Sequence, residues 1–499
     1  MSRSFTTSLA VLTAALATPV FADVTAADVW SNQQALISAA GGTLSGDPSG
    51  GSVSPELNFI LPGGEASFQI TADALAMSEN GDGSVTITYP SPMAITLSGG
   101  AAGEGSFNAE MVMTHDGYTA VATGEPGDIA YDTDATNLRI EVTRITMEGE
   151  GGENVDMTGF LTMTAFSNDS RITEGNLIRY VTESMTGDSV AEFTFTADNV
   201  TSISKQTTRP IRTSIDASLP VGGSNILNLS QAMRDGLSVM VDSLGEGTSS
   251  SSVTTLETDL LNRQESTTGP QTFTLSLGED GMDLDVEAAD FTLLMNDPLV
   301  FPGDLEFAMA GIYAKYVLPL NASDEAQDFR VATSITGITM ADTIWNLFDP
   351  AGQLPRDPAD ITLDVTGVGT NGVDLLDFAA LSQMAGPPPV EVDEVTIESL
   401  RIAAVGAEAT AQGSMTFDWT DFETIPGLPR PEGAITINLN GANALMDTLV
   451  DMGFIPAEDL MMPRMMMGMF ATPVGDDMLE SVIEVNEQGH VLANGQRLQ

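Results

Sequence analysis

Few residues of this chain have the types and spacing that catalysis requires. The 499-residue sequence has no cysteine and only two histidines, His115 and His490, both in polar contexts next to turns. A zinc site usually needs several histidine or cysteine ligands, and a Ser-His-Asp triad would have to use one of these two histidines without a G-x-S-x-G elbow. No phosphate-binding loop of the G-x-x-x-x-G-K-[ST] type is present. The sequence therefore predicts no catalytic residues and no cofactor.

The segment SISK, residues 202–205, matches the S-x-x-K motif of penicillin-recognising enzymes. That motif places the serine at the start of a helix, so that the lysine one turn later reaches its hydroxyl. Here the flanking residues have an extended or looped pattern, and the companion S-D-N and K-T-G motifs are absent. We interpret the match as a coincidence of spacing.

Two clusters of aspartate are the remaining candidates for acid–base or metal chemistry. Neither has the order of an EF-hand loop, with glycine at position six and glutamate at position twelve. A carboxylate pair for glycan hydrolysis depends on separation in space and not on sequence spacing, so it stays open as an alternative. The aspartates are Asp128, Asp132 and Asp134 in the first cluster and Asp280, Asp283, Asp285 and Asp290 in the second.

A methionine-rich segment, LMMPRMMMGMF at residues 460–470, holds six of the 26 methionines. On a helix, three of them share one face, which would present thioether sulfurs to Cu(I) or a soft apolar surface to a lipid. No histidine or cysteine adjoins them, so core packing on a helix that Pro463 kinks or restarts is favoured over copper, and we predict no metal. The candidate contacts for an apolar ligand are Met462, Met466, Met469 and Phe470.

The charge of the chain restricts its partners. There are 17 Lys+Arg against 70 Asp+Glu, a formal net charge of −53. Such a negative field repels phosphate backbones and anionic lipid headgroups, so nucleic acid is excluded as a partner. Disorder is not expected, because 42% of the residues are hydrophobic and patterned segments run along most of the chain. We interpret the charge as a solvated acidic surface.

The first residues have the features of a secretory signal peptide. Arg3 gives a positive start, residues 9–17 form an apolar run too short to span a bilayer, and Val20 and Ala22 are small residues at the −3 and −1 positions. We expect residues 1–22 to be removed and the protein to be periplasmic, with secretion as the alternative. No later segment has about 20 uninterrupted apolar residues, so the chain is not expected to span a membrane.

Period-two alternation dominates the rest of the chain and predicts antiparallel strands with one solvated face. An opening helix is expected after Thr25, an N-cap residue with Asp28 three positions on. The predicted fold class is α+β, mostly β, with long antiparallel sheets and short amphipathic helices packed on them. Examples of the alternating segments are residues 84–89, 93–99, 137–149, 191–200 and 272–294, the last with GEDG as a hairpin turn.

Two segments interrupt this pattern and suggest a domain organisation. Apolar residues recur at steps of three and four over residues 224–244, which predicts a helix, and the Ser/Thr-rich segment from Gly245 predicts a mobile loop or boundary. We expect a β-rich N-terminal domain at 23–222, a helical segment with this loop at 223–270, and a β-rich C-terminal domain at 271–499.

The C-terminal half repeats a unit in which a strand leads to a glycine and then to a short helix. The expected turning points are Gly337, Gly367 and Gly441. A chain that leaves a sheet, turns at glycine and lays the apolar stripe of a helix on that sheet explains the repetition. This repetition predicts architecture and not chemistry.

Four stretches of the chain resemble one known family. They are ADVTAADVW at residues 22–30 and the segments 347–367, 402–418 and 479–498. Together they resemble an uncharacterised secreted alphaproteobacterial family, a domain of unknown function (family 2125), over nearly all of the chain after residue 22. The resemblance implies a Gram-negative source and a periplasmic address, and it brings no catalytic residues.

The function expected from these observations is that of a non-enzymatic periplasmic protein. It would bind an apolar, lipid-like ligand or an envelope partner along a concave sheet face. The alternatives are a carboxylate-dependent glycan hydrolase and a structural or assembly factor of the cell envelope.

Overall fold

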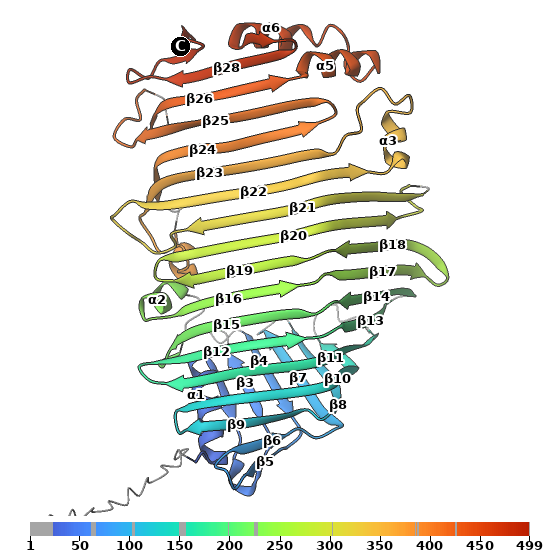
Figure 1. The fold of residues 1–499 in the computed structure, drawn as a ribbon, viewed down its shortest axis with the longest axis vertical. Helices are drawn as coiled ribbons and strands as arrows, with labels where there is room; N and C mark the ends of the chain where they lie inside the picture. Colours follow the sequence, from blue (N-terminus) through green and yellow to red (C-terminus); the bar gives the residue numbers. More distant parts are fainter. Residues whose placement is uncertain are drawn as a thin grey trace, which may run out of the picture.

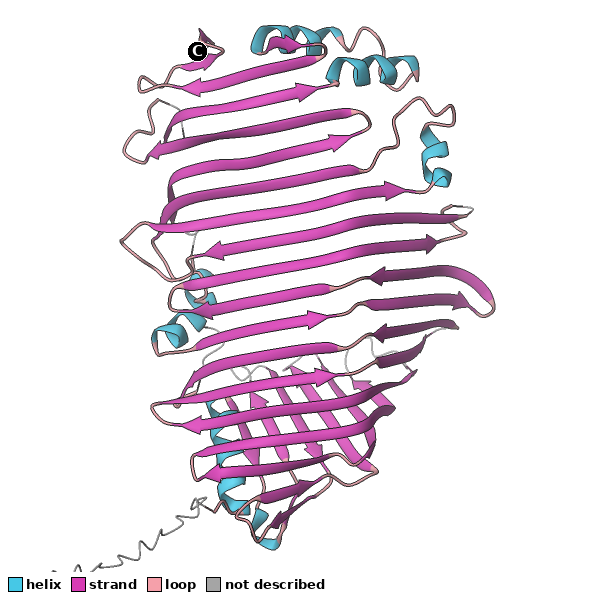
Figure 2. Ribbon diagram, viewed as in Figure 1, coloured by secondary structure: helices cyan, strands magenta, loops and turns pink. Residues whose placement is uncertain are grey.

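The computed structural model describes residues 23–498 apart from 61–65, 102–104, 149–155, 198, 224–227, 302, 385, 387–388 and 425–426. The expected signal peptide lies outside these described residues. Within them, none of the helices has the length and apolar character needed to cross a bilayer. The predicted fold class is confirmed, because the chain forms one very large antiparallel sheet with a few short helices (Figures 1 and 2).

The described helices are few and short, and most of the remaining residues are in strands. The helices are α1 (Ala26–Ala39), η1 (Pro48–Gly50), α2 (Leu229–Arg234), α3 (Asp342–Phe348), α4 (Phe378–Leu381), α5 (Ala442–Asp451) and α6 (Met461–Phe470). The strands of the first half are β1 (Gly42–Ser45), β2 (Ser52–Val53), β3 (Glu56–Ile60), β4 (Ala66–Ala72), β5 (Leu75–Glu79), β6 (Val85–Thr88), β7 (Met93–Ala101), β8 (Gly105–Asp116), β9 (Thr119–Glu125), β10 (Asp128–Glu148), β11 (Asp156–Glu174), β12 (Leu177–Thr186), β13 (Ser189–Ala197), β14 (Val200–Thr208) and β15 (Ile211–Pro220). Those of the second half are β16 (Ser238–Gly245), β17 (Thr248–Leu256), β18 (Asp259–Thr268), β19 (Gln271–Gly278), β20 (Gly281–Asn296), β21 (Asp304–Leu318), β22 (Gln327–Met340), β23 (Ala359–Asn371), β24 (Val390–Ala404), β25 (Ala407–Asp418), β26 (Arg430–Asn440), β27 (Thr472–Gly475), β28 (Met478–Val485), β29 (Val491–Ala493) and β30 (Gln496–Arg497).

From β10 onward the sheet is a meander of long strands, several of which are interrupted half-way. The strands β12 and β13 together lie along the single strand β11, and β18 and β19 together lie along β20. The two halves of each such strand are separated by two residues, for example Gly187-Asp188 and Gly269-Pro270. The sheet is therefore two short strands wide between β11 and β20, and one long strand wide beyond it (Figure 1).

The uninterrupted long strands have backbone irregularities at the same half-way position. Ala165 in β11, Asp290 in β20 and Gly337 in β22 all have positive φ angles, of 50°, 51° and 65°. One extra residue at a bulge shifts the alternation of side chains, so that two residues an odd number of positions apart across the bulge face the same way. In β22 the pairing with β23 shifts between Ile335 and Ile338, which pair with Ile361 and Ala359, so these two isoleucines share a face.

The N-terminal part has two layers because β10 divides its pairing between two strands. Residues 128–134 of β10 pair with β9, whereas residues 137–148 pair with β8. The chain before β8 therefore folds back, and Figure 1 shows β3, β4 and β7 behind β10 to β12. The main hydrophobic core lies between these layers and includes Val29, Val85, Ile129 and Ile172.

The helix α1 begins as the sequence predicts and packs inside this part. The Thr25 side chain accepts a hydrogen bond from the Asp28 backbone N–H, and the Asp28 carboxylate accepts from the Thr25 backbone N–H, which together form a capping box. The buried Asn32 side chain donates from Nδ2 to Glu174 Oε1 at 2.7 Å and accepts at Oδ1 from the Tyr131 hydroxyl at 2.9 Å. These bonds fix the helix on β10 and β11.

The helix predicted over residues 224–244 is wrong beyond its first part. The described helix α2 ends at Arg234, Gly236 has a φ of +101°, and residues 238–245 form strand β16. The apolar spacing of three and four residues is a coincidence in this segment, because Val239 and Val241 alternate on a strand that pairs with β15 and β19. Tertiary pairing decides the structure here.

The loop predicted after Gly245 is also wrong, since residues 248–256 form strand β17 between β14 and β18. Serine and threonine suit this strand because its neighbours are equally polar: Ser250 Oγ lies 2.7 Å from Ser266 Oγ, and Thr254 donates to Ser202 Oγ. Strand pairing continues through both expected domain boundaries, between β15 and β16 and between β18 and β20. The domain boundaries themselves stay predictions.

Only one of the three expected turning glycines lies between a strand and a helix. Gly441, with a φ of +71°, separates β26 from α5. Gly337 and Gly367 lie inside β22 and β23. Gly337 occupies the half-way bulge, and a Cβ on Gly367 would lie 2.3 Å from the ring of Phe329 on the neighbouring strand. These two glycines are required by the backbone and packing of the sheet, and neither precedes a helix.

Candidate ligand-binding face and cavity

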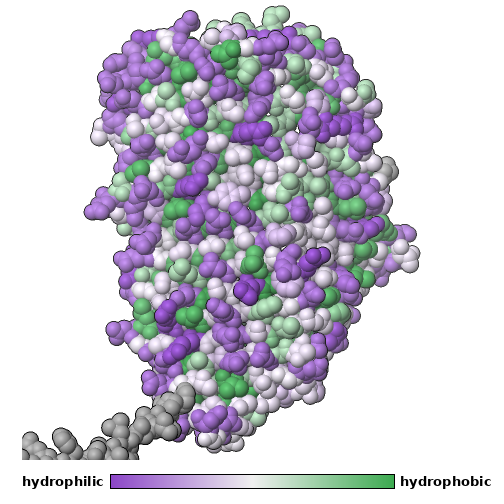
Figure 3. All heavy atoms as spheres, viewed as in Figure 1, coloured by the Kyte–Doolittle hydropathy of each residue, from purple (hydrophilic) through white to green (hydrophobic). Residues whose placement is uncertain are grey.

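The two faces of the long sheet differ in chemistry. One face, called here the polar face, has cross-strand ion pairs, including Arg179–Asp216 and Arg330–Asp364, each at 2.7 Å. Figure 3 shows this face, because the second layer of the N-terminal part lies behind the sheet in the same view, and hydrophilic residues are spread over it. Exposed apolar side chains such as Met240 and Leu244 interrupt it in places.

The opposite face has a continuous row of uncharged, mostly apolar side chains, called here the apolar row. It begins in the N-terminal core and passes from one paired residue to the next through every neighbouring strand to β29. Its members are Val85, Ala122, Tyr131, Ser170, Thr182, Ile215, Val241, Leu275, Leu284, Tyr316, Val331, Val365, Ile397, Gly413, Ile435, Ile483 and Ala493.

The apolar row is covered at its start and open over most of its length. Val85 and Ala122 are 0% exposed and Tyr131 is 4% exposed, because the second layer and α1 cover them. Among the described residues of β16 to β26, the main strand contacts are between sheet neighbours, and the helices lie at the ends of strands, where the α2 cluster packs on Val239 and Leu277 (Figure 2). On this same face Ile361 and Ile402, which pair with each other, are 43% and 48% exposed.

A cavity of about 320 Å³ lies where the covered and open parts of this face meet. It is enclosed by α1, by residues of the strands β5, β6 and β9, and by the apolar-face side chains of β10 to β12. Four of the six tyrosines and one of the three tryptophans of the chain line it. These aromatic residues are Trp30, Tyr89, Tyr118, Tyr131 and Tyr180.

Two tyrosines of this aromatic cavity, Tyr89 and Tyr118, are held in place by ring contacts. Tyr89 and Tyr118 stack with ring centroids 4.2 Å apart, and Tyr118 meets Phe166 edge-on at 6.1 Å. Burial raises the pKa of Tyr89 and of Tyr118 above the ordinary value for tyrosine. Both hydroxyls are therefore neutral donors and acceptors at physiological pH.

His115, one of the two histidines, supports the edge of this cavity. Its Nδ1 accepts a hydrogen bond from the Tyr118 backbone N–H at 3.0 Å, and its Nε2 lies 3.1 Å from the carbonyl oxygen of Pro90. Because Nδ1 is an acceptor, Nε2 carries the hydrogen and donates to that carbonyl. Both ring nitrogens are thus engaged with the backbone, which fits a structural role.

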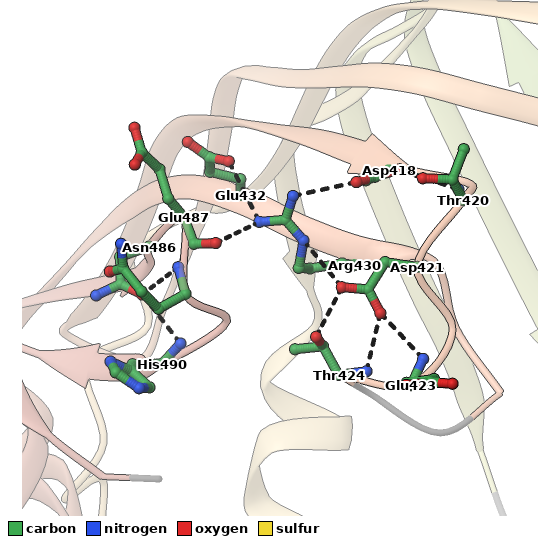
Figure 4. Close-up of polar contacts among 11 residues, drawn as sticks. Asp418, Thr420, Asp421, Glu423, Thr424, Arg430, Glu432, Asn486, Glu487 and His490 are labelled. Atoms are coloured by element: carbon green, nitrogen blue, oxygen red, sulfur yellow. Dashed lines mark hydrogen bonds and ion pairs between the residues drawn. The ribbon is translucent and has the colours of Figure 1, made fainter.

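The other histidine, His490, lies beside an ion-pair cluster at the far end of the sheet (Figure 4). Arg430 contacts the carboxylates of Asp418, Asp421 and Glu432 and donates to the Glu487 carbonyl oxygen at 2.7 Å. These contacts tie the segment after β25 to β26 and to the final hairpin. All three carboxylates contact the guanidinium group of Arg430, so the role of this cluster is to hold loops together.

The four residues proposed as ligand contacts from the sequence lie on α6, at the opposite end of the sheet from the aromatic cavity (Figure 1). Met462, Met466 and Met469 are 60%, 49% and 55% exposed, whereas Phe470 is half-buried. The expectation that these methionines pack in a core is wrong, because α6 lies beyond the last long strands. Pro463 falls in the first turn of α6, where its missing N–H is tolerated. Their contact with a ligand stays a prediction.

The motifs considered for catalysis lie apart from the cavity. Ser202 and Lys205 are three residues apart on the extended strand β14, so their side chains point to opposite faces. Asp283 and Asp285 form ion pairs with Lys315, and Asp128 pairs with Arg171, all on the polar face. In the described parts of the chain, no group of three or more His, Asp or Glu side chains is arranged to hold a metal ion.

Sequence reasoning missed the aromatic cavity because its residues are scattered from Trp30 to Tyr180. The one available signal was the scarcity of Trp and Tyr, which makes any gathering of them significant. A scan of protein-family models, a search of curated proteins and a search of solved structures each found no match to this chain.

Proposed function

We propose that this chain is a non-enzymatic, periplasmic lipid-binding protein that holds hydrocarbon chains on the open part of the apolar row. The observation that carries the proposal is the row itself, which continues the hydrophobic core across the sheet after its covering layer has ended. The periplasmic address is proposed from the signal-peptide features of residues 1–22.

The chemistry of the row favours hydrocarbon as its occupant. The backbone groups beneath it are already paired within the sheet, and from Ile215 to Ala493 its side chains offer a ligand no charge. Each methylene that such a surface takes out of water contributes about 0.8 kcal/mol. The ion pairs that would suit a polar ligand are on the other face.

The length of the row also fits lipid. It crosses twelve strands between β15 and β29, and neighbouring strands are about 4.8 Å apart, so it extends over roughly 50 Å. One hydrocarbon chain of a bilayer leaflet covers about half of the roughly 30 Å apolar thickness of a membrane. The row therefore has room for several acyl chains end to end, or for one long polyisoprenoid chain.

The test is to purify the protein from its native envelope, extract it with organic solvent and identify bound lipids by mass spectrometry. The critical variant is Val365→Asp, which places a charge in the apolar row. The matched control is Thr362→Asp on the same strand, because side chains at odd spacing along a strand point to opposite faces. We expect Val365→Asp to lower the bound lipid at least fivefold and Thr362→Asp to leave it within twofold.

Three outcomes would contradict this proposal. They are a wild-type protein that is consistently free of lipid, an equal effect of both substitutions, and a lipid-free protein that forms a stable dimer through this face. A lipid-free protein that co-purifies with an envelope protein would instead favour the assembly-factor alternative.

A further inference from the structure

The aromatic cavity extends the proposed function, because it lies at the covered end of the same face. Its wall includes Tyr131 and Ser170, two members of the apolar row, and the row continues from Ser170 through Thr182 and Ile215 to Val241 of β16. The cavity wall and the open sheet are therefore joined along this face by uncharged side chains.

The lining of the cavity selects against charge. The whole chain has a net charge of −53, yet no Asp, Glu, Lys or Arg is among the described residues that line this cavity. A phosphate or carboxylate headgroup placed there would lose its hydration without gaining a counter-ion. The end of the ligand that enters must be uncharged.

The aromatic side chains and the polar groups define what that uncharged end contains. Trp30 and the stacked pair of Tyr89 and Tyr118 present flat apolar surfaces, which favour a planar ring over a flexible chain. Asn168 accepts from Thr182 through Oδ1 at 2.7 Å, so its Nδ2 is left to donate. Gln33 of α1 offers a second side-chain amide, which has two N–H groups and also hydrogen-bonds with Tyr131.

We propose that the aromatic cavity binds the ring of an uncharged, ring-headed lipid of the quinone class. The ring lies against Trp30 and the tyrosines, its carbonyl oxygens accept hydrogen bonds from Asn168 and Gln33, and its isoprenoid tail continues along the apolar row. This inference rests on the proposed function only for the tail, because the ring has a cavity of its own.

Trp30 provides an internal reporter for the test. In a protein with Trp345→Phe and Trp419→Phe, Trp30 is the only tryptophan, and its emission is titrated with ubiquinone-1, a quinone with one isoprenoid unit. We expect saturable quenching that Asn168→Leu and Gln33→Leu each weaken at least tenfold. The control Tyr316→Leu, on the apolar face outside the cavity, should change the apparent Kd less than twofold.

Equilibrium dialysis of ubiquinone-1 against the protein with all tryptophans intact provides a second measurement, should the tryptophan substitutions disturb folding. Monoolein, an uncharged lipid with an acyl chain and no ring, is dialysed in parallel. Absence of saturable ubiquinone-1 binding, or equal effects of Asn168→Leu and Tyr316→Leu, would overturn the ring site. Loss of monoolein binding with ubiquinone-1 binding intact would instead contradict the proposed chain-binding function.

Discussion

Ile172 and Ile361 lie on the same face of the same sheet but in different surroundings. Ile172, in the two-layered N-terminal part, is 1% exposed, whereas Ile361, in the single-layered part, is 43% exposed. Both parts are built from long antiparallel strands with the same alternation of apolar and polar side chains. The difference shows that an amphipathic sheet does not by itself produce a core, since a core also needs a covering layer.

The described hydrophobic clusters follow this difference. The main cluster lies in the two-layered part, and a smaller one lies beneath α2, around Met233 and Leu237. The long strands beyond are held mainly by their backbone hydrogen bonds and by side-chain pairs. We therefore expect substitutions to affect folding in the two-layered part and ligand binding in the open part.

The largest contrast should come from the same substitution at both isoleucines. Ile172→Ala leaves a cavity in a closed core and should lower the free energy of unfolding by about 3 to 4 kcal/mol. Ile361→Ala removes a half-exposed side chain and should lower it by less than about 1 kcal/mol. Urea unfolding followed by circular dichroism measures both. Equal losses would show that the open part has a core of its own.

An intermediate contrast concerns polar contacts in the two parts. Asn32→Leu removes the 2.9 Å hydrogen bond from the buried Tyr131 hydroxyl and the 2.7 Å hydrogen bond to Glu174, and should destabilise the protein by about 2 kcal/mol. Arg330→Ala breaks the ion pair with Asp364, whose side chains are 43% and 23% exposed, and should cost less than about 1 kcal/mol. Thermal and urea unfolding measure both losses of stability. A larger loss for Arg330→Ala than for Asn32→Leu would contradict this expectation.

The smallest effect is a pH dependence at the far end of the open part. Hydrogen bonds from Thr420, together with Arg430, lower the pKa of Asp418 to about 2 from its ordinary value of 3.8. A carboxyl with a lowered folded-state pKa stabilises the fold above its unfolded value and loses that contribution as the pH falls through the folded value.

The expected window is therefore between about pH 4 and pH 2, with no contribution to pH dependence from this group above about pH 5. Trp419, which is adjacent to Asp418 and donates to the Val392 carbonyl oxygen, reports on this region. With Trp30→Phe and Trp345→Phe in both proteins, its emission in urea should show a steeper loss of structure on acidification with Asp418 present than with Asp418→Asn. Parallel pH profiles of the two proteins would show that Asp418 does not cause the loss of structure at low pH.

Local features were predictable because neighbouring residues determine them. Thr25 and Asp28 are three positions apart and cap a helix wherever it packs, and the Gly-Glu-Asp-Gly turn joins β19 and β20 as expected. The predictions were wrong for segments whose structure depends on partners that are distant in the sequence. Residues 238–245 are a strand because β15 and β19 lie on either side of them, and nothing in their own spacing shows this.

The sequence by itself determined the class of the fold, the acidic surface and the scarcity of catalytic residues, because composition and alternation act locally. Only the tertiary structure decided where the apolar face is covered, since that follows from β10 dividing its pairing between β8 and β9. The same division brings Trp30, Tyr89 and Tyr180 around one cavity, although long stretches of chain separate them. Contacts over such separations depend on strand register, which no short stretch of sequence specifies.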